Sequence, residues 1–273
     1  MIVDFSAKHE LVNINDKDIK KPIYRVYEVS RLIDIFEKKD LCLVKPKLWD
    51  DPYENFLKYA QGVGEFRGKK INFTYNYDQD TIFGQCWTLN KETDATWRIY
   101  SPMCDRVKVK TSIEKLFNFM KGFNDELLFT YIGKVKYTKQ KNILSQITKE
   151  IKEQSPYLSF HFDSLIKKYY LVKRDVFKYE NEIRLMVSLP DKRENDINSI
   201  YRDPNNLDVC RFPLPDPGNF FDEIVFDPRM ENSLVRAFTT YFKSSLKFNK
   251  DIYKSKLYDK PYVKMKVNFE FPQ

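Results

Sequence analysis

Two glutamates and an arginine stand two positions apart in the segment 173–187, which begins with polar residues and ends in a run of β-forming residues. In an extended chain Glu180, Glu182 and Arg184 share one face. Two carboxylates and a guanidinium at the start of an apolar strand are costly to desolvate unless they have partners or a use. They therefore form either a structural ion pair, with Lys173 as a further cation, or part of a catalytic site.

A second candidate group lies near the N-terminus, where residues 23–27 are predicted to form a strand. Arg25 lies on this strand between aromatic residues, directly after Tyr24. An arginine that faces a half-buried surface requires an anion. That anion is either a bound ligand or a carboxylate at the edge of the core.

A third group is aromatic. Trp97 and Tyr100 are three positions apart in a segment that is amphipathic for about one helical turn, and Ser101 follows directly. The usual role of such a pair is to anchor a helix in the core. The functional alternative is a platform for a flat ring, with the serine hydroxyl beside it.

Three carboxylates, Asp50, Asp51 and Glu54, lie within five positions around Pro52. Such a cluster can bind a divalent cation. More often it caps the helix that follows, which here is predicted at residues 53–59 with Asp51 as the N-cap. We interpret this cluster as a cap and predict no metal site.

The composition restricts the possible functions. The chain has 273 residues, of which 42% are apolar and 16% aromatic, enough for one domain with a large core. It has only 7 glycines and contains no glycine-rich phosphate loop. The four cysteines are far apart, as expected of reduced thiols in the cytoplasm. Two histidines are too few for a three-histidine metal centre, and they also argue against a serine–histidine–aspartate triad.

Charge and hydropathy indicate the kind of partner. No apolar run approaches the roughly 20 residues of a membrane span, and the N-terminus lacks the features of a signal peptide. We therefore expect a cytoplasmic protein without a membrane partner. The net charge of +8 permits a polyanionic partner such as nucleic acid, although the lysines are spread along the whole chain.

The elements that must position these residues alternate between strands and helices, without a repeat or a linker. Residues 1–21 are polar and are predicted to form a loose arm. Residues 190–220 lack periodicity and are predicted to be a long loop. Residues 22–273 are predicted to form a single α+β domain with a mixed, mostly antiparallel sheet core and flanking helices. The predicted strands are 23–27, 41–44, 82–88, 106–110, 131–137, 183–189, 223–226 and 263–269.

Six pieces of the sequence resemble a bacterial family of unknown function, domain-of-unknown-function family 2971. They are residues 23–25, 48–54, 97–101, 173–185, 225–229 and 254–258. Their order and number make the resemblance specific, but the family does not by itself imply an activity.

The chain is also similar to the ADP-ribosyltransferase superfamily, which implies a split sheet and a residue pattern. In that superfamily a first-strand arginine or histidine supports NAD, and a central element shapes the nicotinamide pocket. A late glutamate, often preceded two residues earlier by glutamine or glutamate, is catalytic. The similarity assigns these roles to Arg25, to the Trp97–Ser101 element and to Glu180 with Glu182. The central motif here is Trp-Arg-Ile-Tyr-Ser instead of Ser-Thr-Ser.

The chemistry implied by this similarity requires these residue types. Cleavage of the nicotinamide–ribose bond builds positive charge on the ribose, which a fixed carboxylate stabilises. Nicotinamide stacks on an aromatic surface, and a pyrophosphate suits an arginine fork. Glu180 can accept a proton from the attacking group.

We therefore predict an ADP-ribosyltransferase-like enzyme that consumes NAD as a substrate and modifies a nucleic acid or a protein, in bacterial defence or as a toxin. Glu182 and Glu180 are the predicted catalytic residues. The predicted NAD-binding residues are Arg25, Tyr24, Trp97, Tyr100, Ser101, Lys173 and Arg184. Two alternatives remain: a non-catalytic nucleic-acid-binding module, and a carboxylate–metal nuclease that uses Asp50, Asp51 and Glu54, with Glu182 and Lys173 as further candidates.

Overall fold

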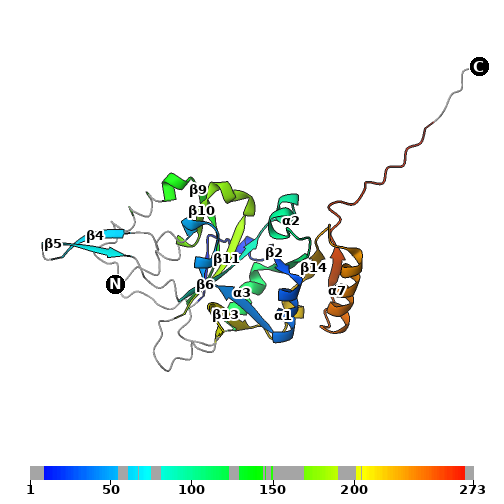
Figure 1. Ribbon diagram of the computed structural model, residues 1–273, viewed down its shortest axis with the longest axis horizontal. Coiled ribbons are helices and arrows are strands. Elements are labelled where there is room, and N and C mark those ends of the chain that lie inside the picture. Colours follow the sequence, from blue (N-terminus) through cyan, green and yellow to red (C-terminus); the bar gives the residue numbers. More distant parts are fainter. Residues whose placement is uncertain are drawn as a thin grey trace, which may run out of the picture.

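The structure is a computed structural model of the chain (Figure 1). It describes residues 9–54, 61–66, 68–74, 81–122, 129–143, 145, 149, 169–189, 201–203 and 205–267. Within these residues, no helix is both long and apolar enough to cross a membrane.

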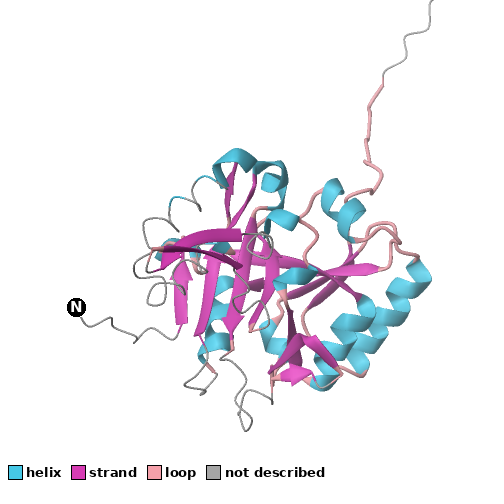
Figure 2. Ribbon diagram, turned by 60° about the vertical axis from the view of Figure 1, so that its left-hand side comes forward, coloured by secondary structure: helices cyan, strands magenta, loops and turns pink. Residues whose placement is uncertain are grey.

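A large mixed sheet forms the centre of the molecule (Figures 1 and 2). Its main path runs in the order β1-β8-β11-β6-β2-β7-β14-β15. The pairs β1/β8 and β14/β15 are parallel, and the other neighbours on this path are antiparallel. The bounds are β1 His9–Val12, β8 Phe129–Lys134, β11 Glu182–Ser188, β6 Ile82–Thr88, β2 Pro22–Glu28, β7 Arg106–Ser112, β14 Glu223–Phe226 and β15 Asp251–Lys254. The predicted α+β class with a mostly antiparallel sheet is confirmed.

Three further strands extend the sheet, and two pairs form small sheets. β3 (Asp40–Val44) pairs with β6 and β13 (Asn206–Pro213), and β13 also pairs with β12 (Arg202–Asp203). The small sheets are β4/β5 and β9/β10, with bounds β4 Gln61–Phe66, β5 Lys69–Thr74, β9 Lys136–Thr138 and β10 Val172–Arg174.

The large sheet is split between β2 and β6. These two strands pair at a single position, where Tyr24 lies opposite Thr88. Further along β6, the pairing passes to β3, at Val44 and Gly84. The side chain of Gln85 bridges the gap, because its Nε2 donates to the Cys42 carbonyl over 2.9 Å and to the Tyr27 hydroxyl over 3.1 Å. Side chains thus supply hydrogen bonds that a continuous ladder would otherwise make.

Helices pack against the apolar face of the sheet. α1 buries residues at helical spacing, including Leu32 and Phe36, as an amphipathic helix does. The Phe36 ring contacts the rings of Phe221, Phe242 and Phe248 at centroid distances of 5.7–5.9 Å. The helix bounds are α1 Val29–Lys38, α2 Asp94–Tyr100, α3 Ile113–Lys121, α6 Pro217–Phe220 and α7 Asn232–Ser244, with 3-10 helices at Asp16–Asp18, Pro46–Leu48, Pro52–Glu54 and Asp175–Glu180.

Two predicted irregular segments contain regular structure. Within the predicted arm 1–21, residues 9–12 form β1, whose Leu11 packs against the core. Within the predicted loop 190–220, the described residues form β12, β13 and α6, and Phe212 of β13 is fully buried. Both strands depend on distant partners, β8 and β3, so local periodicity did not predict them.

The predicted C-terminal strand 263–269 is wrong over the residues that the structure describes. Residues 259–267 form no strand, and Val263 and Met265 are 70% and 78% exposed. Alternation defines which residues would share a face, but it does not supply a neighbouring strand. Residues 268–269 lie outside the described residues, as do most of the residues of the helix predicted at 53–59.

Candidate active site

A row of three residues crosses the sheet at its split. Glu182, at the start of β11, lies directly opposite Thr88 of β6, and Thr88 lies opposite Tyr24 of β2. Residues opposite one another in neighbouring strands point to the same face. The fold therefore brings Glu182 and Tyr24, predicted separately from the sequence, onto one face with Thr88 between them.

Glu180 reaches the same place by a different route. It is the last residue of the 3-10 helix Asp175–Glu180, and Asn181 then takes a left-handed conformation with φ 46° before β11 begins. Asparagine adopts this conformation more readily than most residues. The two glutamates are therefore not neighbours on one strand face, as expected from the sequence, but they meet around Lys173.

Five charged residues form what we call the charge cluster: Glu54, Lys173, Glu180, Glu182 and Arg184. The Lys173 ammonium contacts Glu182 Oε1 at 2.8 Å, forms an ion pair with Glu180, and lies 3.6 Å from Glu54. The Arg184 Nε donates to Glu182 Oε2 over 2.6 Å, and its Nη2 pairs with Glu54. Arg184 is fully buried and Glu182 is 6% exposed. The structural ion pair between Glu182 and Arg184 is therefore present, within a larger network.

The two neighbouring carboxyl groups have opposite pKa shifts. Burial would raise the pKa of Glu182, but the charge of Arg184, a hydrogen bond with Glu180 and the charge of Lys173 together hold it well below its usual range. Burial raises the pKa of Glu180 to about 7, with a further contribution from Glu182 and an opposing one from Lys173. Near neutral pH, one carboxylate is thus permanently ionised while its neighbour can accept or release a proton, the arrangement that acid–base chemistry requires.

Tyr100 contacts this pair from α2. Its hydroxyl donates to Glu180 Oε1 over 3.0 Å, and the residue is 39% exposed. On the other side, the Tyr137 hydroxyl accepts the backbone N–H of Glu182 over 2.9 Å. Glu180 therefore lies between the partly exposed Tyr100 and the buried Glu182.

Trp97 of α2 and Ser101, the residue directly after this helix, are both buried. Trp97 is fully buried, and its Nε1 donates to Glu92 over 2.6 Å. The Lys108 ammonium lies 5.6 Å from the Trp97 ring centroid and 5.4 Å from that of Tyr24. Ser101 is also fully buried, and its Oγ accepts the backbone N–H of Arg106 over 3.3 Å. These contacts fix α2 against the sheet.

Arg25 lies in the split, on the opposite face of β2 from Tyr24. Its Nη1 donates to the carbonyl of Cys86, and its guanidinium lies 5.2 Å from the ring of Tyr27. Its Nε is buried without a hydrogen-bond partner. Within the described residues, no ion pair joins Arg25 to a carboxylate.

Several residues of the site were not singled out from the sequence. The Thr88 hydroxyl donates to the Glu180 carbonyl over 2.6 Å, and Asn90 Nδ2 donates to the Tyr179 carbonyl over 2.6 Å. Both residues stand at or just after the end of the predicted strand 82–88. Polar residues at a strand end are the one local signal that could have identified them, because their partners are about 90 residues away.

The carboxylates at Pro52 have separate roles. Asp51 Oδ1 accepts the backbone N–H of Tyr53 over 3.0 Å, as an N-cap does, and pairs with Arg174 at 2.9 Å. Glu54 instead belongs to the charge cluster. Across the described ranges, no group of three or more histidine, cysteine, aspartate or glutamate side chains is arranged to hold a metal ion.

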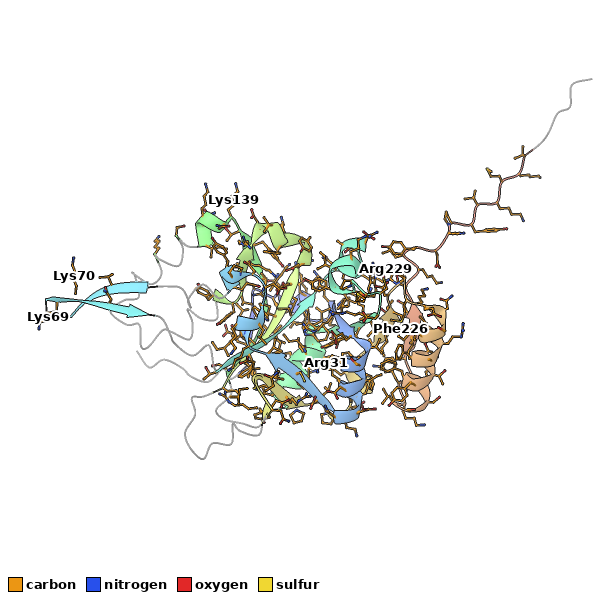
Figure 3. The ribbon with its side chains drawn as sticks, viewed as in Figure 1. Arg31, Lys69, Lys70, Lys139, Phe226 and Arg229 are labelled. Carbon is orange, nitrogen blue, oxygen red and sulfur yellow. The ribbon has the colours of Figure 1, made fainter. Side chains whose placement is uncertain are left out.

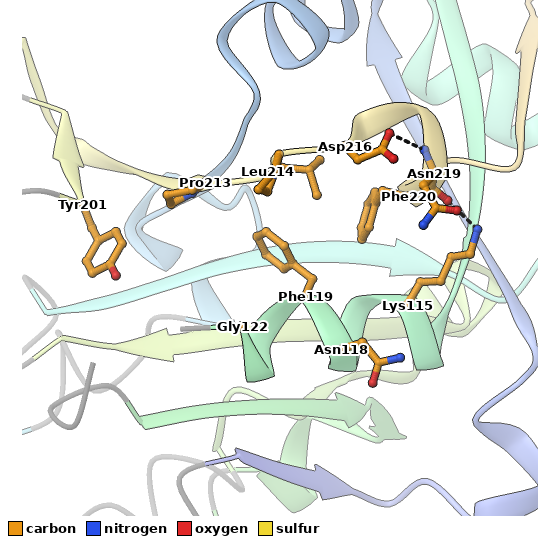
Figure 4. Close-up of a pocket in the computed structure, with 11 residues that line it drawn as sticks. Lys115, Asn118, Phe119, Gly122, Tyr201, Pro213, Leu214, Asp216, Asn219 and Phe220 are labelled. Carbon is orange, nitrogen blue, oxygen red and sulfur yellow. Dashed lines mark hydrogen bonds between the residues drawn. The ribbon is translucent and has the colours of Figure 1, made fainter. Parts of the chain in front are cut away.

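A pocket of about 610 Å³ lies elsewhere in the fold, between α3 and the segment 213–220 (Figure 4). The rings of Phe119 and Phe220 line it with centroids 5.8 Å apart, and Lys115 lies at one end. Its lining includes no member of the charge cluster.

Comparison with known proteins supports the family resemblance. The sequence model of a family described as a protein of unknown function (DUF2971) matches residues 96–185, which is less than half of the chain. This range contains the motifs at 97–101 and 173–185 and leaves the other four outside it. No protein of curated function matches the chain.

Three solved structures of Thermus sp. 2.9 DarT are similar to this chain in outline. The complex with NAD+ has 10% identity and a TM-score of 0.36, covering 89% of this chain and 98% of that one. The complex with ADP-ribosylated ssDNA has 9% identity and a TM-score of 0.37, covering 89% and 97%. The complex with carba-NAD+ has 12% identity and a TM-score of 0.35, covering 87% and 96%. At such values the function of this chain must be inferred from its own residues.

Proposed function

We propose that this protein is an ADP-ribosyltransferase-like enzyme that cleaves NAD and transfers ADP-ribose to an acceptor. The observation that carries the proposal is the pair Glu180 and Glu182, two neighbouring carboxyl groups that share the Lys173 ammonium, with the partly exposed Tyr100 bonded to Glu180. Burial raises the pKa of Glu180, whereas Arg184 and Lys173 hold that of Glu182 low. A hydrolytic or transfer reaction at a glycosidic carbon uses such a pair.

Each carboxyl group has a distinct role in the proposed reaction. The bond between the ribose carbon and the nicotinamide nitrogen breaks, and its electron pair leaves with the nicotinamide. Ionised Glu182 stabilises the positive charge that develops on the ribose. The attacking group of the acceptor bonds to the same carbon, and Glu180 accepts its proton. Glu182 keeps its charge throughout because Arg184 and Lys173 hold it ionised.

The remaining predicted residues contribute in two ways. Arg184 and Trp97 are fully buried, so we assign them to supporting Glu182 and α2. Arg25 has a buried Nε without a partner, and its guanidinium suits a phosphate oxygen of NAD at the split. Tyr24, at the end of the row, and the partly exposed Tyr100 provide aromatic surface, and Lys173 provides a second cation.

The proposed acceptor is a single-stranded nucleic acid, as in a cytoplasmic defence or toxin enzyme. The chain carries a net charge of +8. Lys69 and Lys70 are exposed at the start of β5, beside the turn of the β4/β5 hairpin, which projects from the rest of the molecule (Figure 3). A basic hairpin can contact phosphates without regard to sequence. A protein acceptor is the other outcome of the test below.

The proposal is tested by measuring nicotinamide release from NAD in the presence of a chelator, with single-stranded DNA, RNA or protein as acceptor. We expect the wild type to release nicotinamide and to add the mass of ADP-ribose to one of these acceptors. Both activities should be strongly reduced in Glu182→Gln and Glu180→Gln. Glu114→Gln, a change on the exposed face of α3, is the matched control. No release with any acceptor would overturn the proposal, and metal-dependent strand cleavage would favour the nuclease alternative.

A further inference from the structure

The C-terminal end of α2 is held by an arginine from a distant part of the chain. Arg229 Nη2 donates to the carbonyl of Trp97 over 3.0 Å and to that of Ser101 over 2.8 Å. The Trp97 carbonyl also accepts the backbone N–H of Ser101 over 2.9 Å, and the Ser101 carbonyl accepts that of Cys104 over 3.1 Å. Arg229 therefore adds a second donor to each carbonyl and reinforces the last turn of α2. Figure 3 labels Arg229 in this part of the molecule.

Arg229 is itself fixed by Asp227, two residues before it. Its Nε donates to Asp227 Oδ1 over 3.0 Å and its Nη2 to Oδ2 over 2.7 Å, while its backbone N–H donates to Oδ1 over 2.7 Å. Asp227 is fully buried. Burial opposes its ionisation, but the bonds from Arg229 outweigh this effect and keep its pKa below the usual value. The guanidinium is therefore oriented before it meets α2.

The N-terminal end of α2 has its own contacts. Thr93 is the N-cap, and its side chain accepts the backbone N–H of Thr96 over 3.0 Å. The hydroxyl of Tyr258 bonds to Asp94 in the first turn. Arg229 and Tyr258, which belong to the resembling pieces 225–229 and 254–258, thus contact opposite ends of one short helix.

We infer that Arg229 is a positioning residue for Tyr100. Tyr100 lies between Trp97 and Ser101, the two residues whose carbonyls Arg229 holds. Its own ring is partly exposed, so packing alone fixes it weakly. With the last turn held, its hydroxyl reaches Glu180 at 3.0 Å. For catalysis this inference rests on the function proposed above.

A double-mutant cycle separates positioning from general stability. We expect Arg229→Met and Tyr100→Phe each to lower turnover by about tenfold, the loss of one modest hydrogen-bond contribution. The double variant should be no slower than Tyr100→Phe, because both changes remove the same contact. Arg229→Lys should recover part of the loss, since lysine can also donate to carbonyls.

The control is Arg211→Met. Arg211 pairs with Asp203 and Asp40, away from α2, so its loss should lower the melting temperature without changing turnover per folded molecule. Additive losses in the double variant would overturn the inference. So would full turnover in Arg229→Met.

A second readout does not depend on NAD. The carboxyl carbon of Glu180 can be titrated by NMR, with assignment from Glu180→Gln. This carboxyl group faces Tyr100 from α2, Lys173 from β10, Glu182 from β11 and Tyr179 beside it. Tyr100→Phe and Arg229→Met should move its titration in the same direction, and the double variant no further. If the wild type does not cleave NAD but this coupling is found, the proposed function fails and the positioning role stands. If Arg229→Met leaves the titration unchanged while Tyr100→Phe moves it, the positioning role fails.

Discussion

Arg184 and Glu54 form a buried ion pair although 130 residues separate them in the sequence. Arg184 also bonds Glu182 and the Tyr170 carbonyl, and it lies over the ring of Trp49 at 4.5 Å. One guanidinium thus ties the strand that carries Glu182 to the turn after Pro52. Removing it would leave two buried carboxylates facing one ammonium, that of Lys173.

The first prediction follows from this pair. Arg184→Met should lower the free energy of unfolding by about 3–5 kcal/mol, because breaking a buried pair leaves charge uncompensated. Urea denaturation measures the change. Arg98→Met, which removes an exposed pair with Asp94, is the control and should have little effect. Equal stabilities of the Arg184 and Arg98 variants would contradict the prediction.

The second prediction concerns Glu182. Glu182→Gln keeps the size of the side chain but removes the charge that opposes the ribosyl cation. We expect a loss of about 3 kcal/mol or more in transition-state stabilisation, roughly a hundredfold or greater in rate. Nicotinamide release should be measured per folded molecule, since Glu182 also pairs with Lys173 and Arg184. Full turnover in this variant would leave Glu182 with a structural role alone.

The third prediction concerns pH. The pKa of Glu180 is raised to about 7 by burial and Glu182, so the folded protein binds its proton more tightly than the unfolded chain. The stability this contributes is fully present below about pH 4.3 and is lost as the pH rises to about 7. Glu180→Gln should therefore gain about 1–2 kcal/mol relative to the wild type between pH 5 and pH 8, after allowance for solvent screening. Parallel pH profiles of unfolding for the two proteins would contradict the raised pKa.

The fourth prediction concerns the β4/β5 hairpin, whose turn contains Gly68 at φ 76°. If Lys69 and Lys70 contact phosphates, binding to single-stranded DNA should weaken with salt by a slope of roughly −0.7 per phosphate in log K against log salt. Replacing both lysines by alanine should then reduce the slope by about 1.4. The matched change of Lys243 and Lys247, exposed on or just after α7, should leave it unaltered. A slope that does not depend on the hairpin would exclude it from the acceptor site.

Local patterns predicted the parts of the fold that depend on local sequence. The apolar runs at 82–88 and 223–226 are strands, and Leu116 and Met120 are buried at helical spacing in α3, which Ser112 caps. The segment 173–187 also contained the residues that form the charge cluster with Glu54. These features follow from side-chain periodicity and capping, which the sequence carries directly.

Relationships across the sheet were not predictable in the same way. The row of Glu182, Thr88 and Tyr24 depends on the register of three strands, and a register is set by contacts between distant segments. The roles of Glu54 and Arg229 are also non-local, at 130 and 132 residues from a partner. One sequence shows that such residues are present but does not show which of them meet.

The single pairing between β2 and β6 has a mechanical consequence. Neighbouring strands such as β11 and β6, or β2 and β7, share several backbone pairings, whereas β2 and β6 share one, at Tyr24 and Thr88. Two side-chain bonds also cross this line, from Gln85 to the Tyr27 hydroxyl and from Arg25 to the Cys86 carbonyl. Among the described strands of the main path, this junction therefore has the fewest backbone hydrogen bonds. Tyr24 stands on one side of this line and Glu182 on the other, on the same face of the sheet, so a ligand that touches both would span a junction held by one backbone pairing.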